Sequence, residues 1–195
     1  MKDLITIGLD LSLAKTGVNI LKNKDVIYSG IIKSKPTDRT PMGETKRLMD
    51  ITDDVFTLIE NKLWTLEPDL VLIEGIAFMA RNSTALSQLS GLSYLIRAEL
   101  ILNDWPFTII APTTLKKFIT GSGKADKDVM MMKVYKDYGL EYSDNNESDA
   151  FGLSACGMAV LGNPLKKITK PQEEVIELLK KQHEKNKHKC KKNRI

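Results

Sequence analysis

A chain of 195 residues with 42% hydrophobic and 28% charged residues can bury a substantial core as one domain. It holds no run of about 18 apolar residues, no charged-then-apolar leader and no cysteine pair with metal-ligand spacing, so we expect a cytoplasmic protein without a membrane span or secretory signal. The net charge of +4 hides an asymmetry, because residues 165–195 carry net +7 and residues 1–164 net −3; this pattern fits either a polyanion partner or a merely solvated tail.

The first part of the chain reads as three short strands and a helix. Apolar runs separated by turn residues predict strands over 4–10, 17–21 and 26–32, joined as two hairpins. A polar loop follows. From 42 to 66 apolar residues recur at steps of three and four, which predicts a helix ended by Glu67-Pro68-Asp69.

Strands and helices then alternate. We expect strands over 70–74 and 107–111, and helices over 82–102, 112–119, 126–138 and 145–162. An initial meander followed by such alternation predicts an α/β fold with a mixed five-stranded sheet, whose later strands run parallel to the first and are joined by right-handed crossovers.

The end of the chain is Lys- and Glu-rich. Beyond Pro164 we expect one short helix around Val175 to Leu179 and then a disordered end, so residues 1–164 form the folded domain and residues 165–195 a basic C-terminal tail. Trp64 and Trp105 sit among apolar neighbours and are expected to be structural.

Three acids occupy unusual places. Asp10 ends an apolar strand, where a lone carboxylate is costly unless it is paired or coordinated. Glu74 ends the strand Leu70–Ile73, and Asp149 opens an apolar helix. If the fold brings them together, their mutual repulsion calls for a hard cation, and oxygen ligands of this kind suit Mg²⁺ or Mn²⁺. The alternative is that Asp10 and Asp149 cap turns and helices; for Asp149 the two readings are equally good.

Five motifs in order resemble one family. They are Gly8-Leu-Asp-Leu-Ser12, Val71-Leu-Ile-Glu-Gly75, Ala111-Pro-Thr-Thr-Leu-Lys-Lys117, Thr120-Gly-Ser-Gly-Lys-Ala-Asp-Lys127 and Ser148-Asp-Ala150. In this order and spacing they resemble the RuvC-type Holliday-junction resolvases of the ribonuclease H-like superfamily, including phage-type members. The resemblance runs from about Leu4 to Leu161 and implies a ribonuclease H-like fold.

The resemblance also implies roles for single residues. Asp10, Glu74 and Asp149 match the family's metal-binding acids, and Lys116 and Lys127 match its basic residues near the scissile phosphate. The family's fourth ligand is usually Asp or His three residues before the last acid, but that position is Asn146. Asn146 could coordinate weakly through its amide oxygen, and Glu147 and Asp144 are the alternatives.

Further residues are expected to contact DNA. Phe78 matches an aromatic residue that the family uses at the junction centre, and Arg81 follows in the same loop, although Phe78 fits a core position equally well by residue type. Lys117 and Lys124 lie in the two lysine-containing motifs. The segment 120–127 lacks the Gly-Lys-Ser/Thr ending of a nucleotide-binding loop, so we favour a contact to the DNA backbone. Solubilising lysines are the alternative for Lys116 and Lys127.

The resemblance implies a metal-dependent endodeoxyribonuclease that resolves four-way junctions and leaves 5′-phosphates, using two Mg²⁺ ions (or Mn²⁺) about 4 Å apart. A homodimer in a bacterial cell or a phage-infected host would supply the two cuts. One alternative is an actin-like ATP-dependent phosphotransferase, although the chain is short for two lobes and Ser12 stands where such enzymes carry Gly. The other is a non-catalytic junction-binding protein, which would be better served without the acids.

Overall fold

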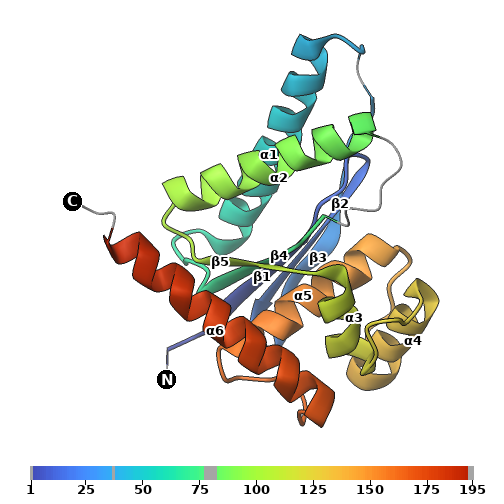
Figure 1. Ribbon diagram of the computed structural model, residues 1–195, viewed down its shortest axis with the longest axis vertical. Coiled ribbons are helices and arrows are strands. Elements are labelled where there is room, and N and C mark those ends of the chain that lie inside the picture. Colours follow the sequence, from blue (N-terminus) through green and yellow to red (C-terminus); the bar gives the residue numbers. More distant parts are fainter. Residues whose placement is uncertain (1, 37, 77–82, 193–195) are drawn as a thin grey trace.

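The computed structural model describes residues 2–36, 38–76 and 83–192 as a sheet covered by helices on both faces (Figure 1). The strands are β1 (Ile5–Asp10), β2 (Lys15–Lys22), β3 (Asp25–Lys33), β4 (Leu70–Glu74) and β5 (Phe107–Ile110). The helices are α1 (Pro41–Leu63), α2 (Ser83–Leu102), α3 (Pro112–Thr120), α4 (Lys127–Tyr138), α5 (Asn145–Val160) and α6 (Lys170–Lys192).

The five strands form one sheet in the order β3-β2-β1-β4-β5. β1, β2 and β3 pair as an antiparallel meander, while β4 runs parallel to β1 and β5 runs parallel to β4. The predicted mixed five-stranded sheet is therefore confirmed. Because β1 and β4 are parallel neighbours, their carboxyl ends lie at the same edge of the sheet.

The sheet separates two hydrophobic cores. On one face, alternate residues of β1, β2 and β4, such as Ile7 and Ile73, pack against α1 and α2. On the other face, Leu70 and Leu72 of β4 pack with residues of α3, α4, α5 and α6. Since side chains alternate along a strand, Glu74 shares the face of Leu70 and Leu72. The same alternation directs Thr6, Gly8 and Asp10 of β1 toward α5.

Helix α5 lies unusually close to β1. Thr6 Oγ1 donates a hydrogen bond to the carbonyl oxygen of Ser154 at 2.9 Å, which fixes the helix along the strand. A Cβ atom at Gly8 would overlap the Ala150 carbonyl oxygen and would lie 2.7 Å from the Ser154 nitrogen. Only glycine at this position lets the backbone of α5 approach the strand. The first turn of α5, with Asp149, is thereby held beside the end of β1.

The C-terminal segment differs from its prediction. Instead of one short helix, α6 spans 23 residues, and Val175, Ile176 and Leu179 on one of its faces join the core formed with α3 and α5. The end of the segment, residues 193–195, lies outside the described residues. The prediction was wrong because the segment's many Lys and Glu residues lower its mean hydropathy without interrupting an apolar stripe at helical spacing.

The two tryptophans behave differently. Trp105 is buried and stacks on Phe56 with ring centroids 5.6 Å apart, as predicted. Trp64 ends α1 with a φ of 55° and is 88% exposed, so its predicted structural role was wrong. None of the helices in the described ranges has the length and hydropathy required to cross a membrane.

Candidate active site

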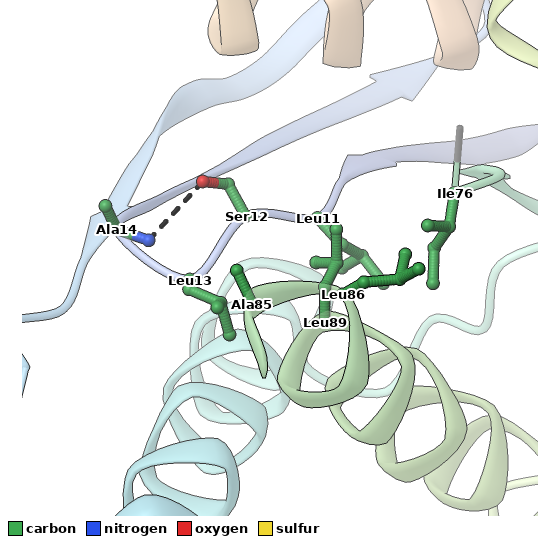
Figure 2. A pocket seen from close by; sticks show the side chains of 8 residues that line it. All are labelled: Leu11, Ser12, Leu13, Ala14, Ile76, Ala85, Leu86 and Leu89. Carbon is green, nitrogen blue, oxygen red and sulfur yellow. Dashed lines mark hydrogen bonds between the residues drawn. The ribbon is translucent and has the colours of Figure 1, made fainter. Parts of the chain in front are cut away.

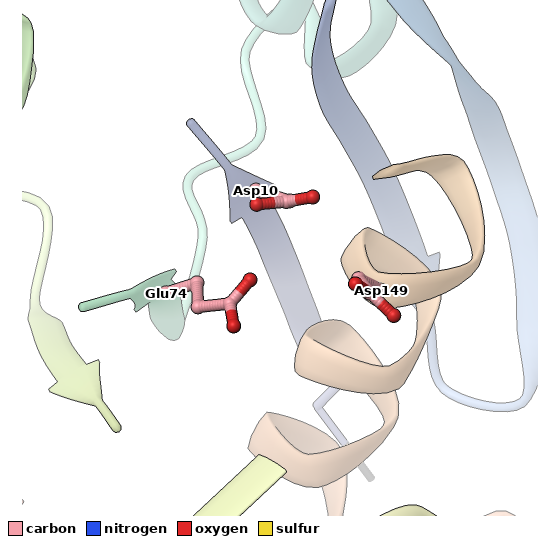
Figure 3. A group of neighbouring side chains, drawn as sticks. All are labelled: Asp10, Glu74 and Asp149. Atoms are coloured by element: carbon pink, nitrogen blue, oxygen red, sulfur yellow. The ribbon is translucent and has the colours of Figure 1, made fainter. Parts of the chain in front are cut away.

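Three carboxylates from separate elements converge at the carboxyl edge of the sheet. Asp10 ends β1, Glu74 ends β4 and Asp149 lies in the first part of α5. One oxygen of each lies within 4.8 Å of the others, and Figure 3 shows the side chains of Asp10 and Glu74 directed toward Asp149. Asp10 and Asp149 are 8% and 5% exposed. The prediction that the fold brings these three acids together is confirmed.

The three acids of the cluster have raised pKa values, so their fully ionised state is unfavourable. Burial raises the pKa of Asp10, and the neighbouring Glu74 carboxylate raises it further. Burial also raises the pKa of Glu74, while the hydrogen bond with Asp10 opposes this shift. The pKa of Asp149 is raised to about 6, again chiefly by burial and then by the charge of Glu74. Binding of a proton or of a cation would each reduce the cost of keeping these carboxylates buried side by side.

The donor set suits a hard divalent cation. Three carboxylates within a few ångströms offer only oxygen ligands, which Mg²⁺ and Mn²⁺ prefer. A cation at this position would neutralise the carboxylates and so offset both their burial and the repulsion that Glu74 exerts on Asp10 and Asp149. The cluster therefore fits a metal site, with Asp10, Glu74 and Asp149 as its ligands.

Two lysines add positive charge beside the acids. Lys127, at the start of α4, places Nζ 4.0 Å from Oδ2 of Asp149. Lys116, one turn into α3, lowers the pKa of both Glu74 and Asp149 by its charge. α3 begins directly after β5, whose last residue Ile110 pairs with Glu74. The sheet and the first turns of two helices thus bring these lysines to the acids.

Comparison with known proteins identifies the family. The model of the family described as crossover junction endodeoxyribonuclease RuvC matches residues 6–157, a span that holds all three acids and both lysines. The chain belongs to this family. RuvC of Corynebacterium diphtheriae is 26% identical over 156 residues, covering 76% of this chain and 90% of that protein. RuvC of Carboxydothermus hydrogenoformans is 28% identical over 162 residues, covering 82% and 98%.

Solved RuvC structures share the fold. Thermus thermophilus RuvC matches with a TM-score of 0.64 at 17% identity, covering 82% of this chain and 98% of that one. The same protein in complex with a Holliday junction substrate gives 0.66 at 17% identity, covering 82% and 97%. The ribonuclease H-like architecture predicted for the chain is the RuvC fold, and α6 lies beyond the matched residues.

The position of the fourth RuvC ligand is occupied differently. The side-chain amide nitrogen of Asn146 donates to the carbonyl oxygen of Lys15, so this amide is oriented by the turn between β1 and β2. Asp144 pairs with Lys15 at 2.9 Å and accepts from the Asn146 nitrogen. Burial raises the pKa of Tyr28 and Tyr142, and the charge of Glu147 adds a smaller increase to both. These contacts hold Asn146 and Asp144 at the turn. Metal coordination by Asn146, Asp144 or Glu147 stays a prediction.

The expected DNA contacts are only partly placed. Lys117 pairs with Glu174 of α6, on a different side of α3 from the acids. Lys124 is exposed in the turn between α3 and α4. Phe78 and Arg81 lie outside the described residues, so their predicted roles at the junction stay predictions.

An open apolar hollow of about 410 Å³ lies between the segment after β1 and helix α2 (Figure 2). It is lined by Leu11, Ser12, Leu13, Ala14, Ile76, Ala85, Leu86 and Leu89. Ser12 turns away and accepts a hydrogen bond from the Ala14 nitrogen. A hollow lined mainly by hydrocarbon offers little to a phosphate, so the predicted phosphate contacts of Lys116 and Lys127 do not involve it.

Sequence reasoning missed the residues that join α6 to this site. Gln172 and Glu174 contact α3, which carries Lys116. Thr169 and Gln172 have the spacing of a capping box, in which the Gln side chain accepts from the backbone of the residue before the helix. This signal predicts a helix start at Thr169.

Proposed function

We propose that this RuvC-family protein hydrolyses phosphodiesters at four-way DNA junctions, with Asp10, Glu74 and Asp149 as ligands of two Mg²⁺ ions. The observation that carries the proposal is the convergence of three buried carboxylates on one edge of the sheet in a chain of this family. Carboxylates so close are unfavourable for binding a polyanion unless cations neutralise them. Mn²⁺ is the expected substitute for Mg²⁺.

The metal supplies the chemistry that the side chains lack. Bound divalent ions make water a better nucleophile at neutral pH and neutralise charge on the departing 3′-oxygen. The acids would hold the ions at the ends of β1 and β4, and the burial of Asp10 and Asp149 would limit competition from bulk water. Release of the 3′-oxygen leaves a 5′-phosphate on the other fragment.

The lysines act on the phosphate itself. The side chain of Lys127 is 56% exposed and its Nζ lies 4.0 Å from Asp149, so it can contact a DNA phosphate beside the acids. Lys116 approaches from α3 on the side of Glu74 and Asp149. Two fixed positive charges offset the negative charge that builds on the phosphate oxygens in the transition state.

Two cuts in one junction require two active sites. A homodimer with two-fold symmetry places one site on each of two opposed strands, which matches the symmetry of a four-way junction. We propose this assembly, in the cytoplasm of a bacterium or an infected host. The chain belongs to an endonuclease family, and two lysines lie beside its three acids. Both facts favour this function over an actin-like phosphotransferase or a non-catalytic junction-binding protein.

A cleavage assay tests the function directly. A labelled mobile four-way junction is incubated with protein and Mg²⁺, with EDTA and a linear duplex of the same sequence as controls, and the nicks are mapped. We expect symmetric, metal-dependent nicks with 5′-phosphates in the junction and far fewer in the duplex. ATP hydrolysis without nicking would support the phosphotransferase, and tight junction binding without nicking would support the non-catalytic binder.

A further inference from the structure

Helix α6 lies outside the residues matched by the family model, yet it packs directly on the helix that carries Lys116. Gln172, Val175, Ile176, Leu179 and His183 are buried along one face of α6. They lie against the core that includes Leu115, Phe118 and Ile119 of α3. At its other end, Asn186 Nδ2 lies 3.4 Å from the carbonyl oxygen of Phe107, which starts the edge strand β5.

Gln172 is the centre of the contact between the two helices. Its Oε1 accepts from both the nitrogen and the hydroxyl of Thr169 at 3.0 Å, so its Nε2 must be the atom that faces α3. Nε2 donates to the carbonyl oxygen of Phe118 at 2.9 Å. That carbonyl is one of the last four of α3, which have no partner within their own helix. Gln172 is 2% exposed, so water does not compete for this bond.

The second contact between α3 and α6 is an ion pair. Lys117 pairs with Glu174 on α6. Successive residues of an α-helix point about 100° apart, so holding Lys117 toward α6 directs Lys116 to a different side. On that side lie the end of β4 and helix α5, which carry Glu74 and Asp149, and α3 packs against α5.

We propose that α6 is a positioning element for the reaction, in which Gln172 and Glu174 hold the last turn of α3 so that Lys116 is presented to the acid cluster. This inference rests on the proposed function for the role of Lys116. Gln172 is a positioning residue, since it touches neither the acids nor Lys116. The pair between Lys117 and Glu174 is half exposed and contributes less than the buried bond.

Gln172→Glu separates the two roles of this side chain. A carboxylate still accepts from Thr169 and keeps the start of α6, but it cannot donate to the Phe118 carbonyl. Single-turnover cleavage of a four-way junction at saturating protein is expected to slow about 10-fold, as small misplacements of catalytic groups do. Junction affinity without metal is expected to stay within about two-fold, because Lys116 is one charge among many backbone contacts. Glu177→Gln, exposed on the same helix, is the matched control and is expected to leave both values unchanged.

A double-mutant comparison distinguishes positioning from general loosening. If Gln172 acts through Lys116, Gln172→Glu slows the wild-type protein but causes no further loss in Lys116→Ala. An equal loss in both backgrounds, or no loss in the wild-type background, overturns the proposal. If Gln172→Glu melts below the assay temperature, Glu174→Gln on the exposed side of α6 takes its place, with an expected loss of about two-fold that also vanishes in Lys116→Ala.

A measurement that needs no cleavage keeps the inference separate from the proposed function. Amide hydrogen exchange across residues 112–120 is expected to be at least about 5-fold faster in Gln172→Glu than in wild type, because one buried hydrogen bond at the end of α3 is removed. Unchanged protection contradicts the inference even if the protein cleaves junctions. Faster exchange in a protein that does not cleave junctions would support the role of Gln172 in holding α3 and would contradict the proposed nuclease function.

Discussion

The charge of Asp10 is the residue-scale feature on which the proposed reaction depends. Asp10→Asn keeps the size and one acceptor oxygen of the side chain but removes the charge that would hold a divalent ion. We expect nicking to fall by at least about 10³-fold, and Glu74→Gln and Asp149→Asn to behave alike, since ligands of one site act as a unit. Single-turnover cleavage and gel-shift binding measure the two properties.

A surface acid gives the matched control for this prediction. Asp54→Asn, exposed on α1, should cleave as wild type does. Near-normal nicking by Asp10→Asn would reject the metal-ligand assignment.

The same acids predict how metal-free stability depends on pH. Asp10, Glu74 and Asp149 have raised pKa values in the folded chain, so they bind more protons when folded than when unfolded. Their favourable contribution is complete below the unfolded pKa of about 4 and is lost as pH rises through the folded values. The metal-free protein is therefore expected to lose melting temperature from pH 5 to pH 8.

Calorimetry with Mg²⁺, Mn²⁺ and EDTA tests this dependence. We expect added metal to restore melting temperature at pH 8 and to have less effect at pH 5. Metal-free Asp10→Asn should melt above wild type at pH 8, by about 2–4 °C for each kcal/mol of repulsion removed. A variant that melts lower under those conditions would contradict the account of mutual repulsion.

The two lysines are expected to affect turnover more than binding. Lys116→Ala and Lys127→Ala each remove one charge near the reacting phosphate, and we expect rates at saturating protein to fall roughly 10- to 100-fold. Lys136→Ala, exposed on α4, controls for loss of a general positive charge. Weaker binding with an unchanged rate would assign Lys116 and Lys127 to general DNA contact.

At the scale of elements, the close approach of α5 to β1 is essential. Gly8→Ala would place a Cβ atom against the backbone of Ala150 and Ser154, where neither atom can move alone. We expect a loss of about 1–3 kcal/mol in the free energy of unfolding and a larger relative loss of cleavage, because displacement of α5 moves Asp149.

Gly91→Ala is the comparison variant for Gly8. Its Cβ would meet only the flexible end of Leu48 at 3.0 Å, so melting and cleavage should be nearly unchanged. Equal effects of the two substitutions would show that the packing between β1 and α5 has no special role.

Sequence reasoning predicted well the elements with a strong apolar pattern. Continuous apolar runs predicted β1 and β4, and the expected parallel pairing of these strands placed Asp10 and Glu74 at one edge of the sheet. The position of Asn146 could not be predicted, because its amide is oriented by the Lys15 carbonyl, a contact between residues 131 positions apart. The full length of α6 was not predicted, because its many Lys and Glu residues suggested disorder and hid the apolar stripe of Val175, Ile176 and Leu179.

At the scale of the whole molecule, the basic C-terminal segment has two parts: a part of α6 that packs on the core, up to about Asn186, and the basic residues after it. Removing residues after Pro164 would take α6 from the core, so we expect lower melting temperature or insolubility. Removing only residues 187–195 keeps the residues of α6 known to be buried, from Gln172 to His183, and deletes five basic residues. For this shorter truncation we expect equally weaker binding to junction and duplex, with the salt slope reduced by about 0.9 for each phosphate that is no longer neutralised.

Affinity measured across a salt series decides whether residues 187–195 bind DNA. Identical slopes for the full chain and the shorter truncation would reject this role. The cut positions should not change, because the acids lie at the opposite end of the sheet from Phe107, where α6 approaches β5.

The three acids come from β1, β4 and α5, which span most of the chain. A ribosome therefore releases the first two long before the third, and domains gain structure from the N-terminus onward during synthesis. Until α5 has emerged and packed beside Gly8, the nascent chain has only two of the three acids in place. Assembly of the acid cluster therefore requires the last helix of the matched region, which the ribosome releases well after β1 and β4.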